Sequence, residues 1–107
     1  VNMTSGVGTG VSYVMGLKRG STEIARGDEA GNRRRASTMG HLESNEDSRD
    51  HSINFLDSPS TTSATTYQVT GFAEGTNTLY LNRTDHDPNS VNEGRAISTI
   101  TAMEVFA

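Results

Sequence analysis

The chain has 107 residues, a formal net charge of −4 and no cysteine. This length corresponds to one domain at most, and the lack of cysteine excludes a disulfide framework or a thiolate zinc site. The sequence offers no run of about 18 apolar residues to span a membrane. Its acidic balance argues against a nucleic-acid partner held by phosphate contacts.

Small polar residues dominate the composition. Thr occurs 14 times, Ser 12 times and Asn 8 times, whereas Val, Leu, Ile and Phe together contribute only 19 residues. Threonine is typical of pleated strands, and Ser, Asn and Gly are typical of the turns between them. We therefore expect an all-β chain with a thin core. Such a small chain gains stability when identical neighbours bury more of its surface, which favours an oligomer.

The chain opens on Val1–Met3, without a signal-peptide pattern, and a glycine-rich turn follows at residues 6–10. Val1–Met3 are typical of the tail of a strand already under way. This favours one or more missing strands in front, in a longer protein of which this is the C-terminal portion. Simple processing of a few residues is the alternative.

The next predicted strand covers residues 11–19, where apolar and polar residues alternate. Tyr13, Met15 and Leu17 share one face, which is the face expected to lie on the core. A Gly-containing turn and a short returning strand at residues 22–25 complete a hairpin.

Residues 26–52 form the least hydrophobic stretch. A strand is expected over residues 36–42 with Met39 turned inward, and residues 43–50 are polar throughout and predict a solvated loop. The alternation of Ile53 with Phe55 then predicts another strand, which ends at a proline.

Three further strands are predicted over residues 66–72, 78–82 and 96–106. In the last one, apolar residues occur on both faces, which is typical of a central strand near a core or an interface. The fold expected from these short strands is a single antiparallel β-sandwich domain of jelly-roll type over residues 1–107. A stripe of seven side chains is expected to fill its core: Tyr67, Val69, Leu79, Leu81, Ile97, Ile100 and Met103.

The second half of the chain carries an ordered set of short motifs. They are FLDSP at 55–59, TTSA at 61–64, TYQV at 66–69, LYLNR at 79–83 and STIT-x-MEV at 98–105. In this order the motifs resemble a group of virion structural proteins of tailed phages, especially phages of marine and aquatic bacteria. The match covers residues 53–106, about half of the chain.

This resemblance implies a jelly roll similar to the complement and tumour-necrosis-factor modules, in which trimers pack their terminal strands near a three-fold axis. It implies a fibre, appendage or capsid-decoration role outside the cell, in contact with other virion proteins and without catalysis. Such domains normally begin with a strand that pairs with the C-terminal strand. Either that strand is missing from this sequence, or a neighbouring chain fills its place.

The loop after residue 82 holds one candidate metal site. Asp85, Asp87 and Asn89 present oxygen ligands at alternate positions, as Ca²⁺ prefers. Ser90 stands where a calcium loop of the EF-hand type needs glycine, and Pro88 interrupts the run. A solvated turn is therefore the preferred interpretation, and we predict no bound metal or cofactor.

Catalytic motifs are missing from the sequence. The histidines at 41, 51 and 86 have no nucleophile elbow or oxyanion-type glycine cluster beside them. The basic run Arg33–Arg35 lacks interleaved aromatic residues, so a solvated strand edge or an intersubunit contact is preferred over a nucleic-acid patch. We expect no enzyme.

Three functions remain open. The preferred one is a virion structural module, a homotrimer whose C-terminal strand lines the subunit core or interface through Ile97, Ile100, Met103 and Val105. The second is a receptor-binding tip for a host surface glycan, with the candidate contacts Tyr13, Tyr80, Asp87 and Asn89. The third is a secreted adhesion module glycosylated at the sequons of Asn2 and Asn82.

Overall fold

The computed structural model describes residues 1–105, and within them every regular element is a strand. The seven strands in chain order are β1 (Asn2–Gly6), β2 (Val11–Arg19), β3 (Thr22–Ile24), β4 (Thr38–Leu42), β5 (Arg49–Ser52), β6 (Tyr67–Ala73) and β7 (Tyr80–Leu81). The predicted all-β class is confirmed. A membrane-spanning helix is likewise missing from residues 1–105.

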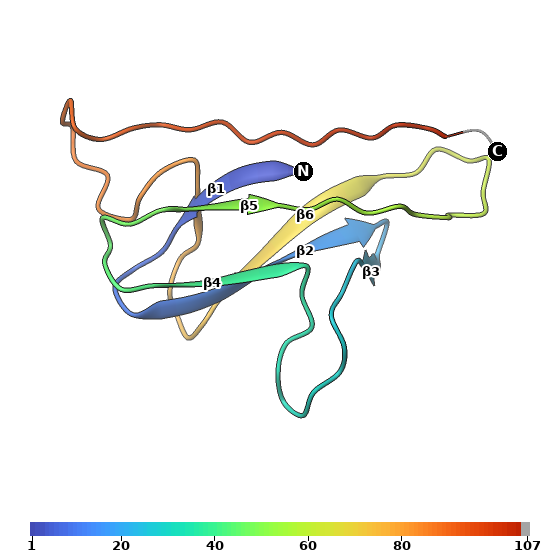
Figure 1. The fold of residues 1–107 in the computed structure, drawn as a ribbon, viewed down its shortest axis with the longest axis horizontal. Helices are drawn as coiled ribbons and strands as arrows, with labels where there is room; N and C mark the ends of the chain where they lie inside the picture. The colour runs from blue at the N-terminus through green and yellow to red at the C-terminus, as the bar shows by residue number, and fades with distance from the viewer. Residues whose placement is uncertain (106–107) are drawn as a thin grey trace.

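The strands form two antiparallel sheets (Figure 1). One has three strands in the order β5-β1-β7. In the other, β2 is central, with β3 and β4 paired along one edge and β6 along the other. The two sheets pack face to face, and the molecule is only 18 Å deep along its shortest axis. The predicted β-sandwich is therefore confirmed.

Strand β2 supplies the centre of the core. Tyr13, Met15 and Leu17 are all buried, as the alternation along this strand predicts. The rest of the core comes from six more residues: Met3, Val7, Val11, Leu42, Ile53 and Ala73. Most of the core therefore belongs to the first half of the chain.

The expectation that a stripe of seven side chains from the second half of the chain fills this core is confirmed only for Val69 and Leu79, which pack against it, and is wrong for its C-terminal members. Ile97 and Met103 are 81% and 83% exposed, and Ile100 and Leu81 are also exposed. Tyr67, Val69 and Leu79 from the same stripe are half-buried. The physical reason is that β7 is only two residues long and residues 96–105 lie at the edge of the small sheet.

The prediction that Met39 turns inward is also wrong. Met39 is 73% exposed, and its neighbours Gly40 and Leu42 face the interior instead. Gly40 lies opposite Tyr13 in the register of β2 and β4. The ring of Tyr13 fills the space over Gly40, so the glycine rather than the methionine has to face the core.

Three predicted boundaries shift. The loop expected over residues 43–50 ends at 48, because β5 starts at Arg49 and pairs with β1. Residues 53–58 continue from β5 outside any strand, although Ile53 is buried. The strand expected over residues 78–82 is reduced to β7.

Candidate functional site

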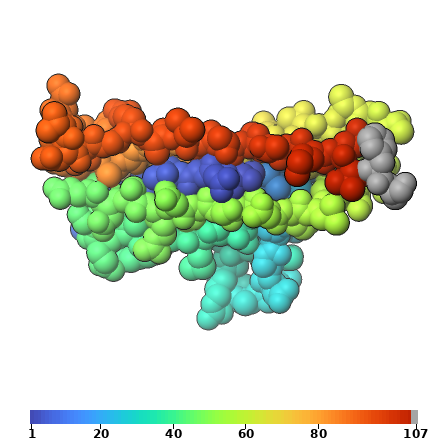
Figure 2. Space-filling model, turned by 45° about the horizontal axis from the view of Figure 1, so that its top comes forward, coloured from blue at the N-terminus to red at the C-terminus, as the bar shows by residue number. Residues whose placement is uncertain are grey.

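The C-terminal segment of residues 96–105 runs along the edge of the three-stranded sheet. Its Thr99 pairs with Asn2 of β1 through two backbone hydrogen bonds, of 3.0 Å and 2.8 Å. Ala96 N donates to the carbonyl oxygen of Asn82, just after β7, at 2.9 Å. The segment therefore continues the row that β7 begins, and Figure 2 shows it (red-orange) lying along β1 (blue). The strand predicted over residues 96–106 is not formed: residues 96–105 are an edge segment with one isolated bridge at Thr99, and residue 106 lies outside the described residues.

The pairing of β1 defines an open strand position beside this segment. Asn2 lies between Ser52 on one side and Thr99 on the other. Both flanking segments continue past the start of β1, as residues 54–58 and 101–105. An antiparallel strand that extended the line of β1 would face residues 54–57 and 101–104 at once. We call this place the open strand position; residues that precede Val1 in a longer chain and a strand of a neighbouring chain would both fit it.

Neither flank of the open strand position is paired. Within residues 1–105, no backbone–backbone hydrogen bond joins residues 54–58 or 101–105 to another segment. Val1 and Ile53 exchange two backbone hydrogen bonds, of 2.8 Å and 2.9 Å, and form the last residue pair before the open strand position. Hydrogen-bonding residues alternate in an antiparallel ladder. The backbone N–H and C=O groups of Phe55, Thr101 and Met103 therefore point toward the open strand position. An added strand would satisfy them.

Apolar side chains surround the open strand position. On one flank Phe55 is half-exposed and Leu56 largely exposed; on the other, Ile100, Met103 and Val105 are exposed. Covering a fully exposed Leu or Met side chain stabilises an interface by about 1.5–3 kcal/mol. Met103 and Val105, two of the four predicted interface residues, therefore lie on this flank, whereas Ile100 comes just before it and Ile97 lies farther back along the same segment.

The flanks lack the usual protection of a sheet edge. Natural proteins protect exposed edges with lysines, prolines or bulges. Residues 96–105 contain no Lys, Arg or Pro, and Glu104 is their one charged residue. The flank of residues 96–105 is therefore an edge without the usual protection against added strands.

The flank of residues 54–58 is held in place by a partly exposed ion pair between Asp57 and Arg19. Both carboxylate oxygens of Asp57 accept hydrogen bonds from Arg19 Nη1, at 2.7 and 2.8 Å, and the Tyr67 hydroxyl donates to Oδ2 at 2.8 Å. These hydrogen bonds, from Tyr67 first and then Arg19, lower the pKa of Asp57, and the carboxylate raises the pKa of Tyr67. Arg19 and Tyr67 face each other on β2 and β6. The cluster thus fixes residues 53–58 to the end of the large sheet.

The candidate glycan contacts do not converge. Tyr13 is only 2% exposed, so its burial in the core removes it from any ligand surface. Tyr80 is half-buried, and the guanidinium of Arg83 lies 3.9 Å from its ring centroid. Asn89 is exposed in the loop of residues 83–95.

Asp87 is already paired inside its own loop. Its Oδ2 accepts a hydrogen bond from Arg83 at 2.7 Å and another from Arg95. Two guanidinium groups on this carboxylate oppose a bound cation and leave Asp85 and Asn89 without their central partner. In the part of the chain that the structure describes, no three His, Asp or Glu side chains cluster as metal ligands.

A buried polar cluster joins the two sheets. His51 Nε2 lies 2.7 Å from the Tyr13 hydroxyl and 3.0 Å from Ser5 Oγ, and its Nδ1 lies 3.0 Å from Thr38 Oγ1. A neutral ring protonated on Nδ1 satisfies two of these contacts, because Nδ1–H donates to Thr38 and Nε2 accepts from Tyr13. Ser5 Oγ in turn donates to the Tyr13 oxygen at 2.8 Å.

This cluster holds a Ser–His pair, but solvent cannot reach it. Ser5 is fully buried, His51 is 5% exposed, and the Tyr13 hydroxyl already occupies Nε2. Burial, and secondarily the charge of Arg49, lowers the pKa of His51, while Asp50 acts in the opposite direction. The geometry suits a neutral histidine that fixes one sheet against the other.

Sequence reasoning missed two parts of these sites. Phe55 and Leu56 were expected to end a strand, and their position beside the C-terminal segment depends on long-range pairing. His51 lies in a polar run, and its inward direction is fixed by its pairing with Met3 of β1. The alternation of Ile53 with Phe55, extended back by one step to His51, was the available signal.

Comparison of the chain with family models, with curated proteins and with solved structures found no match to any of them. The function is therefore inferred from the residues and geometry of the chain itself.

Proposed function

We propose that the chain is a non-enzymatic structural module that assembles with copies of itself by adding a strand at the open strand position. The observation that carries this proposal is the pair of unpaired, apolar flanks at residues 54–58 and 101–105. An incoming strand gains backbone hydrogen bonds on both sides and covers apolar side chains. Because the core is thin, burial of these side chains in an interface adds to the stability of each copy.

The wider setting that we propose is a phage virion, as a fibre, appendage or capsid-decoration module in a trimer. The motif order over residues 53–106 supports this setting. A β-sandwich whose contacts are backbone ladders is suited to carrying load. Mass spectrometry of purified particles should find this chain at a fixed copy number divisible by three. A chain found only outside particles would contradict the virion setting and leave the assembly proposal to its own test.

The assembly proposal is tested by Met103→Asp. A buried charge at this place should weaken association by roughly 30-fold or more, since about 2 kcal/mol of apolar burial is lost. Met39→Asp is the matched control, because Met39 is similarly exposed but lies on the large sheet. Light scattering on a sizing column should show a smaller species for Met103→Asp alone.

Equal masses for the wild type and Met103→Asp would contradict the placement of the interface. Dissociation by both variants would show a general sensitivity to surface charge and would also contradict it.

A further inference from the structure

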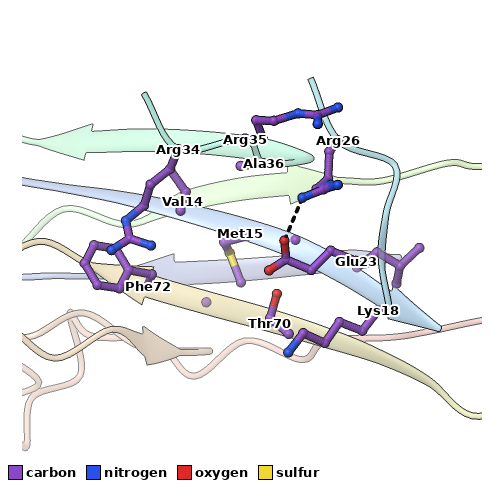
Figure 3. A pocket seen from close by; sticks show the side chains of 13 residues that line it. Val14, Met15, Lys18, Glu23, Arg26, Arg34, Arg35, Ala36, Thr70 and Phe72 are labelled. Atoms are coloured by element: carbon purple, nitrogen blue, oxygen red, sulfur yellow. Dashed lines mark hydrogen bonds and ion pairs between the residues drawn. The ribbon is translucent and has the colours of Figure 1, made fainter. Parts of the chain in front are cut away.

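A pocket of about 410 Å³ lies on the outer face of the four-stranded sheet, below the loop that joins β3 to β4. Its floor includes Val14 and Gly16 of β2 and Phe72 of β6, which alternate with core-facing residues. Its walls include arginines of the loop, and Figure 3 shows how they reach over the sheet. The pocket is separate from the open strand position.

The pocket concentrates positive charge in an acidic chain. Lys18, Arg26, Arg34 and Arg35 line it, against the single carboxylate of Glu23. These are four of the nine basic side chains in a chain of net charge −4. The charge therefore favours an anionic ligand at this one place.

Two of the four cations are engaged by the protein. Arg26 donates to Glu23 at 3.0 Å, and Arg35 Nε donates to the carbonyl oxygen of Gly27 at 2.7 Å, which braces the loop. Among residues 1–105, neither Lys18 nor Arg34 has a carboxylate within ion-pair distance. These two side chains are available to a ligand.

The floor between them combines the apolar side chains of Val14 and Phe72 with the hydroxyl of Thr70. The guanidinium carbon of Arg34 lies 3.5 Å from the ring centroid of Phe72, and this cation–π contact holds Arg34 in position. Gly16 has no side chain, and the Thr70 hydroxyl lies in the space beside it, 2.9 Å from where a Cβ would be. A sugar ring over this floor therefore meets one hydroxyl group as well as apolar side chains.

We propose that this pocket binds an acidic saccharide, a sugar that carries a carboxylate or a sulfate group. The apolar face of the sugar packs over Val14 and the edge of Phe72. Its anionic groups accept charge-assisted hydrogen bonds from Arg34 at one end of the pocket and from Lys18 at the other end (Figure 3). The volume lies within the range of about 300–1,000 Å³ that is typical of small-molecule sites. This inference does not depend on the proposed assembly.

A nucleic acid fits the pocket less well. Single strands bind through aromatic faces on which bases stack, and Arg34 already covers the exposed face of Phe72. A long polyanion would also approach the 13 acidic residues of the chain. A compact ligand with one or two charges avoids this repulsion.

The experiment is isothermal titration calorimetry of the full chain at low ionic strength. The probes are a sulfated heparin disaccharide, digalacturonate, uncharged maltose and, for the nucleic-acid alternative, an oligothymidylate. We expect both acidic sugars to bind and maltose not to bind. Arg34→Gln and Lys18→Gln should each weaken binding about tenfold, the value of one charge-assisted hydrogen bond.

Arg33→Gln is the matched control. Arg33 belongs to the same basic run, but it donates to the carbonyl oxygen of Ala30 and does not line the pocket. Its affinity for the acidic sugars should equal that of the wild type.

Several results would overturn the proposal: no binding of either acidic sugar, an equal loss for Arg33→Gln, or tighter binding of an oligothymidylate. Dissociation of the oligomer by Arg34→Gln would also overturn it, since the pocket would then be a subunit contact. The mass in solution of each variant separates these outcomes from a failure of the assembly proposal. Circular dichroism confirms that the exposed substitutions leave the fold intact.

Discussion

The ring of Tyr13 on β2 lies directly over Gly40 on β4, in the space that a side chain at Gly40 would need. A Cβ on Gly40 would lie within 2.7 Å of the Tyr13 ring carbon Cε1. This placement brings the Tyr13 hydroxyl to within 2.7 Å of His51 on the opposite sheet. The glycine therefore allows one aromatic residue to connect both sheets.

Gly40→Ala should destabilise the fold. The methyl group forces the Tyr13 ring to move, and overpacking of this kind costs about 1–3 kcal/mol. Urea unfolding followed by circular dichroism measures the change. Gly94→Ala is the control, because nothing lies within 4 Å of its would-be Cβ. Equal stability of the two variants would contradict the close packing of Tyr13 on Gly40.

The stability of the fold should fall as the pH drops below about 6.5, the ordinary pKa of histidine. The folded state lowers the pKa of His51, so the unfolded chain takes up the proton first. The stabilisation is therefore complete above the unfolded pKa and is lost as the pH falls toward the folded pKa. Urea unfolding at a series of pH values measures this effect.

Substitution of single histidines assigns this pH dependence. His51→Gln should remove the decrease, whereas His86→Gln should keep it, because the side chain of His86 is exposed. A decrease that survives in His51→Gln would show that another group is responsible.

Asp57→Asn should remove a second, more acidic stability change. Tyr67 and Arg19 lower the pKa of Asp57 below its ordinary value of 3.8, so its stabilisation is present above that value and is lost as the pH falls through the lowered pKa. Melting curves between neutral pH and pH 2 test this prediction. Asp47→Asn, an exposed loop variant, is the control. If the melting temperature of Asp57→Asn falls at acidic pH as much as that of the wild type, the role of this carboxylate is contradicted.

Removal of divalent cations should leave the melting temperature unchanged. Asp87 is already satisfied by Arg83 and Arg95, so Ca²⁺ gains little at this loop. Differential scanning fluorimetry with EDTA and then with excess Ca²⁺ measures this. A rise of several degrees with Ca²⁺ would restore the calcium interpretation of Asp85, Asp87 and Asn89.

Local alternation predicts the parts of the fold that depend on one strand. The buried face of β2 follows from its sequence because Tyr13, Met15 and Leu17 repeat with a period of two. Met39 could not be placed in this way, since its direction depends on the partner across the sheet. Apolar residues on both faces of residues 96–105 suggested a central strand, but the chain itself leaves them uncovered.

The candidate sites were only partly predictable for the same reason. The exposed residues Met103 and Val105 could be proposed as an interface from their sequence. The opposing flank with Phe55, and the meeting of Lys18 with Arg34 in one pocket, require the pairing of strands far apart in the chain. The basic run Arg33–Arg35 is evident in the sequence, but which residues its side chains contact is not.

Thr101→Pro should weaken association about tenfold or more, because the lost N–H points into the open strand position. Ala102→Pro is the matched control, since its N–H points to the opposite edge of the segment. Both positions are exposed, so neither proline disturbs the core. Sedimentation velocity over a range of concentrations compares the two. Equal weakening by both prolines would place the incoming strand elsewhere.

The mass of the wild-type chain in solution shows directly whether the chain associates with copies of itself. One chain has a mass of 11.5 kDa. Sedimentation equilibrium should give three times this value, and the species should persist on dilution. A single species of 11.5 kDa at every concentration would contradict the account, because the apolar flanks of the open strand position would then remain uncovered.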